Sequence, residues 1–258
     1  MAEFIWGRFP VLEALRSRRK VQRLMVAQGP RDAALQQILD QARRVGVSVE
    51  TVSRRRLDEL SKNANHQSVM AVVEPRQYVE VEDLLENARL REESPLLLVL
   101  DAIQDVQNLG SLIRTAEAVG AHGIILREHR AAGLTPVVDK TSAGAVEFMS
   151  VARVTNITHT LDDLKRQGVW CIGLDGDAET PYDKANLTGP IALVVGNEGK
   201  GISRLVREHC DVLIRLPMRG HVGSLNAAVA GSVALYEILR QRGWPAPIEA
   251  GDVVQQEG

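Results

Sequence analysis

This sequence of 258 residues has only two cysteines, three each of tryptophan, tyrosine and phenylalanine, and no long apolar run. Cys171 and Cys210 are far apart and lack the spacing of a disulfide framework or a zinc site, so we expect two structural, buried thiols. The six histidines are equally scattered, so we predict no bound metal. The apolar runs fall far short of the roughly 20 residues that cross a bilayer, and the N-terminus lacks the pattern of a secretory signal. We therefore expect a cytoplasmic protein with no membrane partner.

Charge is divided unevenly along the chain, although the net charge is only −2. Residues 1–75 hold 13 Lys and Arg against 8 Asp and Glu, a net of +5, and the remainder holds 18 against 25, a net of −7. Two basic clusters stand out, and they consist of Arg16, Arg18, Arg19, Lys20 and Arg23, and of Arg54, Arg55 and Arg56. Clusters of this kind attract a phosphate backbone, but they are equally compatible with a solvated helical surface.

The first 75 residues predict a small α/β domain. Apolar and β-branched runs indicate strands over 21–27, 47–52 and 69–73, and amphipathic runs indicate helices over 32–45 and 54–62. We expect residues 76–94, which are acidic and helical in part, to form a linker. The tail of residues 244–258 has the composition of a flexible terminus.

Residues 95–243 predict an α/β domain with a mostly parallel sheet covered on both faces. Short apolar strands alternate with amphipathic helices, the strands over 96–100, 123–126, 169–174, 191–195 and 212–216, and the helices over 109–119, 161–167, 202–209 and 226–240. Ligands of such sheets bind beyond the carboxyl ends of the strands. The glycine-rich turn after Val195 and the proline turn after Leu216 are expected at that edge.

The glycine-rich turn matches neither of the common nucleotide-binding motifs. Gly196-Asn-Glu-Gly199-Lys-Gly201 has the order GxxGxG, which differs from the dinucleotide motif GxGxxG and from the phosphate loop GxxxxGK[ST]. No GxSxG sequence of a serine hydrolase is present either. The turn still indicates backbone folded closely around a ligand.

The predicted helix from Leu109 carries a second informative pattern. Its apolar residues form one stripe, and Arg114 points about 150° away from the centre of that stripe, so Arg114 is not a core residue. Asn108 precedes the helix, where its side chain would cap the exposed amides. Gly110 in the first turn allows another chain or a ligand to approach closely.

Three ordered motifs resemble those of one enzyme family. They are Asn108-Leu-Gly110-Ser-Leu-Ile-Arg114, Gly196-Asn-Glu198-Gly199-Lys-Gly201, and Leu216-Pro217-Met218 followed by Ser224-Leu225-Asn226. This order is similar to that of the SpoU, or TrmH-type, RNA ribose 2'-O-methyltransferases of the SPOUT superfamily. The N-terminal domain, with Gly7-Arg8 and Asn65-His66-Gln67-Ser68, resembles the ribosomal-protein-like substrate-binding domain of many members. Among them, the bacterial enzymes that methylate a guanosine ribose of 23S ribosomal RNA are the most similar.

The resemblance implies a fold, a cofactor and an assembly. The implied catalytic domain is an α/β fold with a C-terminal trefoil knot, which works as a homodimer and binds S-adenosyl-L-methionine. The implied cofactor-binding residues are Val195, Gly196, Asn197, Gly199, Gly201, Leu216, Met218 and Leu225. The implied catalytic residues are Asn108, Arg114, Glu198, Ser224 and Asn226.

Each implied catalytic residue has a physical role that suits it. A guanidinium has a pKa above about 12 and is a poor base, so we expect Arg114 to hold a phosphate and to stabilise the developing 2'-alkoxide. We expect Glu198 to orient Arg114 or Asn108. Ser224 and Asn226 precede a helix, so one of them would cap it and both would bind substrate or cofactor.

Two departures from the family pattern are present. Many members have proline and then a basic residue before the asparagine of the first motif, where this chain has Val106 and Gln107. This change affects the expected turn geometry and any phosphate contact there. Ser68 stands where glycine is usual.

Two alternatives belong to other functional classes. A non-catalytic RNA-binding protein would bind RNA but not S-adenosylmethionine, and a small-molecule nucleotide enzyme would bind ATP or NAD at the Gly196 turn. Within the methyltransferase interpretation, transfer RNA is the alternative substrate. Ribosomal RNA is favoured by analogy, because an N-terminal domain of this size more often accompanies it.

Overall fold

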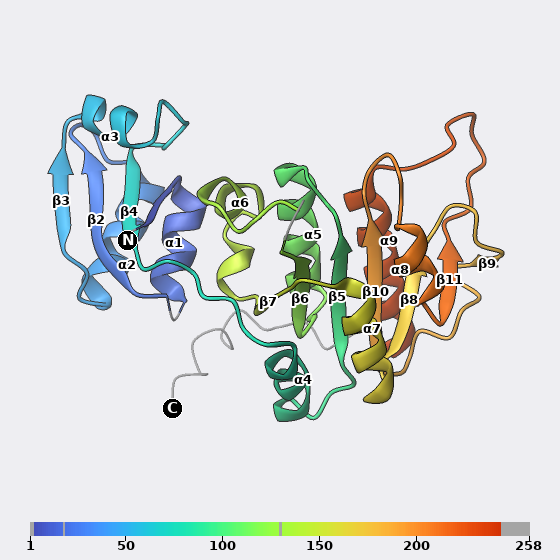
Figure 1. Cartoon of the computed structure of the whole chain (residues 1–258). Helices are drawn as coiled ribbons and strands as arrows, with labels where there is room; N and C mark the ends of the chain where they lie inside the picture. Colours follow the sequence, from blue (N-terminus) through green and yellow to red (C-terminus); the bar gives the residue numbers. More distant parts are fainter. Residues whose placement is uncertain (1–2, 18, 129–130, 244–258) are drawn as a thin grey trace.

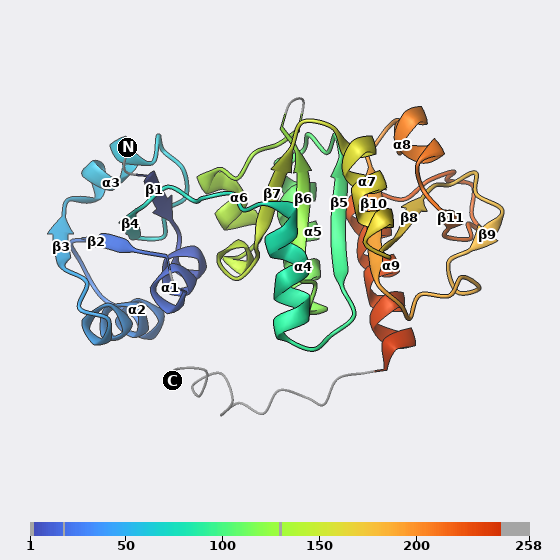
Figure 2. The ribbon, with the colours of Figure 1, turned by 60° about the horizontal axis from the view of Figure 1, so that its bottom comes forward.

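The computed structural model describes residues 3–17, 19–128 and 131–243, which form two α/β domains side by side (Figure 1). The chain passes from the first domain to the second through the segment between β4 and α4 (Figures 1 and 2). The predicted tail, 244–258, lies outside the described residues.

The N-terminal domain is a four-stranded sheet in the order β1-β4-β2-β3, in which only β2 and β3 are parallel. Its elements are β1 (Glu3–Trp6), α1 (Arg8–Arg16), β2 (Val21–Ala27), α2 (Ala33–Arg44), β3 (Val49–Val52), α3 (Arg54–Leu60) and β4 (Val69–Val73). Helices α1 and α2 pack on one face of the sheet, and Leu57 of α3 packs on the other. The three predicted strands and two predicted helices are confirmed, whereas β1 and α1 were not predicted.

Local side-chain bonds fix the helix starts and a strained loop of this domain. The Asp32 carboxylate accepts a hydrogen bond from the Leu35 amide, and the Ser53 hydroxyl accepts one from the Arg56 amide, so each caps its helix. In the loop that precedes β4, Ser68 has a φ of 67°, in the left-handed region that favours glycine. This conformation explains why glycine is usual at that position.

The C-terminal domain is a seven-stranded sheet in the order β7-β6-β5-β10-β8-β11-β9. Every recorded pair of these strands is parallel, which confirms the predicted sheet. The strands are β5 (Leu96–Asp101), β6 (Gly123–Arg127), β7 (Val151–Val154), β8 (Trp170–Leu174), β9 (Thr180–Pro181), β10 (Ile191–Gly196) and β11 (Val212–Arg215). The helices are α4 (Val81–Leu90), α5 (Val106–Ala118), α6 (Pro136–Thr141), α7 (Ile157–Arg166), α8 (Arg204–Glu208) and α9 (Ala227–Arg242), with a 3-10 turn η1 (Ala145–Glu147). No described helix is long and apolar enough to cross a membrane.

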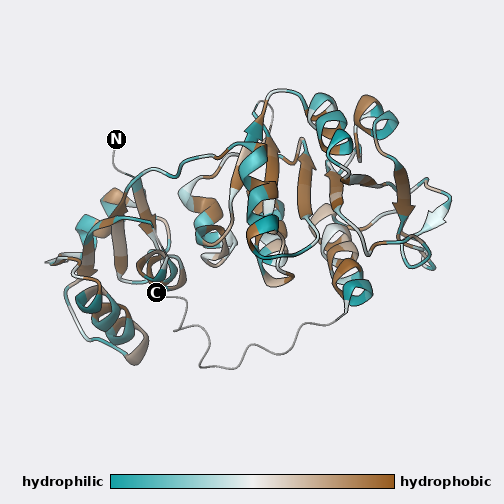
Figure 3. Ribbon diagram, turned by 90° about the horizontal axis from the view of Figure 1, so that it is seen from below, coloured by the Kyte–Doolittle hydropathy of each residue, from teal (hydrophilic) through white to brown (hydrophobic). Residues whose placement is uncertain are grey.

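Both faces of this sheet are covered by helices, as the apolar strands predict. In β5, Leu98 and Leu100 belong to the core beneath α5 and α9, whereas Leu97 and Val99 belong to the core beneath α4, α7 and α8. Figure 3 shows the strands in hydrophobic colours, while the helices present hydrophilic residues outward. This two-sided burial explains why the strands are continuous apolar runs.

The segment 76–94, expected to be a linker, contributes to the second domain. Its helix α4 buries Leu84 and Leu85 in the core that also holds Leu97 and Val99. A β-carbon added to Gly123 would lie 2.4 Å from the Leu84 side chain, so glycine is required for this packing.

A buried cluster of ion pairs joins the two domains. The Arg76 guanidinium lies 2.7 Å from the Asp139 carboxylate and 2.8 Å from that of Glu147, and Arg19 lies 2.9 Å from Glu147. The Arg19 side chain is only 8% exposed and also pairs with Glu3. Arg19 therefore belongs to the domain interface, and the basic cluster predicted around it is not a single RNA-facing surface.

This cluster makes the folded state sensitive to pH. Burial, and to a lesser extent the Glu147 carboxylate, raises the pKa of Asp139 to about 7 against the attraction of Arg76, from 3.8 in an unperturbed chain. Between these two values the folded state binds a proton that the unfolded state releases, so the free energy of unfolding falls as pH rises. We expect this loss to reach a few kcal/mol at most, since one pKa unit corresponds to about 1.4 kcal/mol.

The variant Asp139→Asn isolates this contribution, because asparagine mimics the protonated carboxyl at every pH. Urea unfolding at pH 5 and pH 7.5 should show a smaller loss of stability in the variant than in the wild type. An equal loss in both proteins would mean that other groups cause the pH dependence.

The prediction of buried thiols is confirmed for Cys171 and only in part for Cys210. Cys171 is fully buried on β8, and Cys210 is half-buried after α8. Burial raises the pKa of each thiol to about 12, so neither forms a reactive thiolate near neutral pH.

Candidate active site

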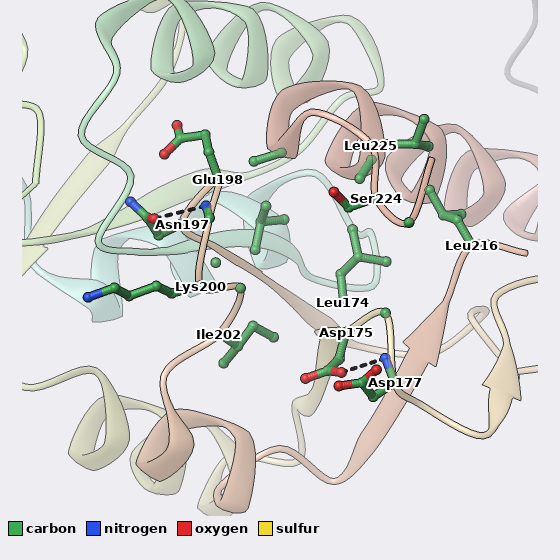
Figure 4. A pocket seen from close by; sticks show the side chains of 18 of the residues that line it. Leu174, Asp175, Asp177, Asn197, Glu198, Lys200, Ile202, Leu216, Ser224 and Leu225 are labelled. Carbon is green, nitrogen blue, oxygen red and sulfur yellow. Dashed lines mark hydrogen bonds between the residues drawn. The ribbon is translucent and has the colours of Figure 1, made fainter. Parts of the chain in front are cut away.

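A cavity of about 380 Å³ lies at the carboxyl edge of β8, β10 and β11, where the parallel sheet predicts a ligand. Its walls come from three loops, those after β8 and β10 and the one that runs from β11 to α9 (Figure 4). All the predicted cofactor residues line it, namely Val195, Gly196, Asn197, Gly199, Gly201, Leu216, Met218 and Leu225. Glu198 and Ser224 line it as well.

The glycine turn after β10 is a tight backbone hairpin. The Asn197 and Gly201 amides each donate to the other residue's carbonyl at 2.9 Å, and the Asn197 side chain accepts from the Gly199 amide at 3.1 Å. A β-carbon on Gly196 would lie 2.0 Å from the Gly201 carbonyl carbon. Gly201 has a φ of 62°, which favours glycine. Two of the three glycines are thus required by the backbone of the turn itself.

The buried carboxylate of Asp101 anchors the far side of this turn. Asp101 ends β5 and is paired in register with Gly196. Its side chain is 1% exposed and accepts a hydrogen bond from the Ser203 amide at 2.8 Å. Its second oxygen lies 3.8 Å from the Arg127 guanidinium. Sequence reasoning did not select Asp101, although an aspartate that ends a buried apolar strand is a signal for such a role.

Three predicted catalytic residues from three motifs form one hydrogen-bonded line. The Asn108 amide donates to the Glu198 carboxylate at 2.6 Å, and the Asn226 amide donates to the Asn108 carbonyl oxygen at 2.8 Å. The Asn226 oxygen in turn accepts from the Ala228 and Val229 amides and caps α9. This line fixes the orientation of both amides and directs Glu198, which borders the cavity.

The turn before Asn108 forms without the usual proline and basic residue. The Asp105 carboxylate accepts from the Gln107 amide at 2.6 Å and from the Asn108 amide at 3.0 Å, so Asp105 caps α5. Capping belongs to Asp105 and not to Asn108, which was the predicted cap. The Asn108 side chain is thereby available for Glu198.

Gly110 admits a neighbouring helix, as predicted, although α5 begins at Val106 and Gly110 lies in its second turn. An added β-carbon would lie 2.0 Å from the Thr141 hydroxyl oxygen of α6. The same hydroxyl donates to the Val106 carbonyl at 3.0 Å, so α6 is held against the start of α5.

Arg114 lies apart from these residues. It is exposed on α5, as its helical position predicts, and it is not among the described residues that line the first cavity. Instead it lines a second cavity with Phe148 and with Phe9 and Glu13 of the N-terminal domain. Within one chain, the structure brings Glu198 to Asn108 and does not pair it with Arg114.

The loop after β8 supplies residues of the site that sequence reasoning missed. Leu174, Asp175, Gly176 and Asp177 line the cavity, with the two carboxylates at the end opposite Glu198 (Figure 4). Asp175 accepts from the Asp177 amide at 2.9 Å and lies 3.3 Å from the Arg207 guanidinium. The signal for them was available, because a loop after any strand beside β10 reaches the same edge of the sheet.

The walls of the cavity are chemically divided. Leu174 of β8 lies between the Glu198 end and the Asp175–Asp177 end, and Leu216 after β11 and Leu225 before α9 add to the apolar wall (Figure 4). Apolar walls suit a flat heterocycle, whereas carboxylates at an end suit hydroxyl or ammonium groups. The residues present therefore fit S-adenosylmethionine, a nucleoside joined to an amino acid.

Two family models match the chain. Residues 95–236 match the SpoU rRNA methylase family, and residues 4–79 match the RNA 2'-O ribose methyltransferase substrate-binding family. The two matches together cover both domains.

Relatives and solved structures agree with these matches. A putative TrmH family tRNA/rRNA methyltransferase, YacO of Bacillus subtilis, is 43% identical over 93% of this chain and 96% of its own length. The SpoU methyltransferase AviRb of Streptomyces viridochromogenes, crystallised with AdoMet, is 29% identical, with a TM-score of 0.79 over 93% of this chain and 90% of its own. An AdoMet-bound rRNA methyltransferase of Sinorhizobium meliloti is 25% identical, with a TM-score of 0.71 over 93% of this chain and 87% of its own.

Proposed function

Because this chain belongs to the SpoU family of methylases, which use S-adenosylmethionine, we propose that it methylates a ribose 2'-oxygen of 23S ribosomal RNA. The observation that carries the proposal is the line Glu198–Asn108–Asn226, which joins all three motifs at the border of the cofactor cavity. A packing role alone would not require a carboxylate at the cavity border to be oriented by two amides in series.

We propose that the cavity binds the cofactor through its backbone turns and leucine walls. The sulfonium of S-adenosylmethionine supplies an electrophilic methyl group when bound. The protein's task is then to hold the ribose oxygen in line with that group and to accept or share its proton. Leu216 and Leu225 would contact the adenine, while Asp175 and Asp177 would receive hydroxyl or ammonium groups at the other end.

We propose that Glu198 and Ser224 contact the target ribose. Both border the cavity, and the Glu198 carboxylate keeps acceptor positions beyond the one that Asn108 fills. Arg114 would hold the phosphate of the target nucleotide and stabilise the developing alkoxide, because its forked donors suit both groups.

A homodimer would bring Arg114 to a site that it does not reach within one chain. Val229, Val233 and Tyr236 are 49%, 38% and 46% exposed and lie on one face of α9, which packs beside α5. An apolar face of this kind suits burial against a second copy. We propose that this face forms the dimer and that Arg114 of each subunit acts at the partner's cavity.

Membership of the SpoU family also leads us to propose the target base, the cellular compartment and the knot. We propose a guanosine target in the cytoplasm, where 23S ribosomal RNA is made, and a trefoil knot in the C-terminal segment. The likeness to an rRNA methyltransferase over 93% of this chain supports ribosomal RNA over transfer RNA, because it includes the N-terminal domain. The position of β10 between β5 and β8, with α9 returning to pack on α5, is compatible with the knot.

Two measurements test the proposed function. Calorimetry with S-adenosylmethionine alone should show binding, and this separates a methyltransferase from an RNA-binding protein without catalysis. Ribose methylation should then be mapped across ribosomal and transfer RNA in cells with and without the gene. Loss of one methylated guanosine of 23S ribosomal RNA is expected. A lost site in transfer RNA would establish the alternative substrate, and no lost site would refute the proposed function.

A further inference from the structure

A further hollow of about 420 Å³, distinct from the one that contains Arg114, lies between the two domains at the start of α5. We call it the interdomain cleft. Its lining comes from both domains, with Trp6 and Ala64 from the N-terminal one and Gln107, Val137, Lys140 and Thr141 from the C-terminal one. Gln107 directly precedes Asn108, so the cleft lies at the same end of α5 as the hydrogen-bonded line of the candidate active site.

The side chains of the interdomain cleft have the chemistry of a nucleotide site. Trp6 is half-buried and packs on the core beneath α3, so one part of its indole is fixed and another faces the cleft. Lys140 is exposed, and none of the described lining residues carries a negative charge. A fixed aromatic ring and an uncompensated ammonium are the groups that bind a base and a phosphate.

Contacts across the domain boundary hold Lys140 in this place. Its ammonium donates to the Asn65 carbonyl at 3.3 Å, which leaves donors for another acceptor. The loop that carries Asn65 is held in turn by His66, whose ring accepts from the Ser68 amide and bonds the Asp58 carboxylate, each at 3.0 Å. The cleft is therefore a built feature and not a gap between loosely joined domains.

Another cavity at the domain boundary is lined by charges of both signs. In the hollow that contains Arg114, the carboxylates of Glu13 and Glu117 accompany the guanidinium. Outside the interdomain cleft, α3 carries Arg54, Arg55 and Arg56, of which Arg55 and Arg56 share the Glu59 carboxylate, so the three arginines keep a net positive charge. An RNA strand thus has a favourable path from α3, past Trp6, to Asn108.

We propose that the interdomain cleft binds the nucleotide next to the target nucleotide, with its base stacked on Trp6 and a phosphate on Lys140. This inference rests on the proposed function and adds a subsite to it. Lys140 then supplies from α6 the positive charge that Gln107 does not provide at the start of α5. The N-terminal domain contributes directly to the active site by placing Trp6 there.

Binding of unmodified 23S ribosomal RNA, transcribed in vitro, tests both contacts. Trp6→Leu should weaken RNA binding about tenfold to a hundredfold, since stacking on an aromatic ring contributes strongly per base. Trp6→Phe keeps an aromatic ring and should therefore retain most of the wild-type affinity. Lys140→Gln should weaken binding several-fold and lower the dependence of log Kd on log salt by about one ionic contact. Affinity for S-adenosylmethionine should not change in any of these variants.

Matched controls come from residues outside the cleft. Trp170→Leu removes an exposed indole from β8, and Lys184→Gln removes an exposed ammonium from the C-terminal domain. Both should leave RNA binding and its salt dependence unchanged. If the cleft variants behave like these controls, or if the controls weaken binding as strongly, the subsite does not exist.

A fluorescence measurement tests the stacking directly. The chain has three tryptophans, so the variant with Trp170→Phe and Trp244→Phe keeps only Trp6. Its emission should be quenched in proportion to bound RNA, and an unchanged emission at saturation would overturn the stacking.

Methyl transfer that survives intact in Trp6→Leu and Lys140→Gln would refute the subsite but leave the proposed function standing. If RNA binding depends on both residues but no methyl transfer is detected, the proposed function is refuted and the RNA contacts of the cleft stand.

Discussion

Replacing Gly196 with alanine should abolish detectable binding of S-adenosylmethionine. The added β-carbon would lie 2.0 Å from the Gly201 carbonyl carbon and 2.2 Å from both the Gly201 oxygen and the Ile202 nitrogen. All three are backbone atoms, so no side-chain movement can relieve the overlap. The hairpin between Asn197 and Gly201 must open, and this displaces Glu198 and Gly199 from the cavity. We expect affinity to fall at least about a hundredfold and Tm to fall by roughly 5–10 °C, corresponding to about 2–3 kcal/mol.

Gly199→Ala is the matched control for this substitution. It adds the same methyl group to the same turn, but the nearest atom, the Asn197 side-chain oxygen, is 4.0 Å from the new carbon. Its Tm should stay within about 2 °C of the wild type, since the turn need not move. Calorimetry and thermal unfolding of both variants test the argument. Binding by Gly196→Ala within threefold of the wild type would show that the turn does not form the cofactor site.

The cofactor side of the site could be predicted because glycine, proline and apolar residues mark backbone turns at one edge of a sheet. The turn after Val195 and the turn after Leu216 follow strands that the apolar runs identify, and parallel strands end at the same edge. The loop of Asp175 and Asp177 follows the same rule. It was missed because its carboxylates are not part of any glycine-rich pattern.

The line Glu198–Asn108–Asn226 could not be predicted from residue types alone. Its members come from three segments, and the contact of Asn108 with Glu198 spans 90 residues of sequence. Glu198 was expected to pair with either Arg114 or Asn108. The structure shows Asn108 as its partner, because Arg114 faces outward on α5. Capping by Asp105 was equally hidden, because Asn108 is an equally good capping residue by type.

Short elements and contacts between domains also could not be predicted from the sequence. Strand β9 has two residues, and α6 has six, which is too short for a periodic pattern. Arg19 belongs to a basic cluster in sequence, yet the buried carboxylates of Glu147 and Asp139 that neutralise it lie more than 100 residues away. A local pattern cannot show which charges are paired by the fold.

Replacing Arg114 with alanine or lysine should lower kcat for methyl transfer about a hundredfold to a thousandfold without changing the affinity for S-adenosylmethionine. The size follows from the loss of a charged donor to a developing oxyanion. The cofactor affinity stays because Arg114 is not among the described residues of that cavity. Lysine keeps the charge and loses the forked donors, so near-normal turnover of Arg114→Lys would contradict the proposed phosphate and alkoxide contacts.

Mixing two inactive variants should restore activity if Arg114 acts at the partner's cavity. Arg114→Ala keeps Glu198, and Glu198→Ala keeps Arg114, so a mixed dimer has one cavity with both residues intact. If the two variants are refolded together and pair at random, half of the dimers are mixed, and each mixed dimer has one working site of two. The expected activity is therefore about a quarter of the wild-type rate. If Arg114 acts within its own chain, every site in the mixture lacks one residue and activity stays at background. Because Arg114 is exposed on α5 and lines a different hollow from the cavity that Glu198 borders, while Glu198 is bonded to Asn108, we expect restoration.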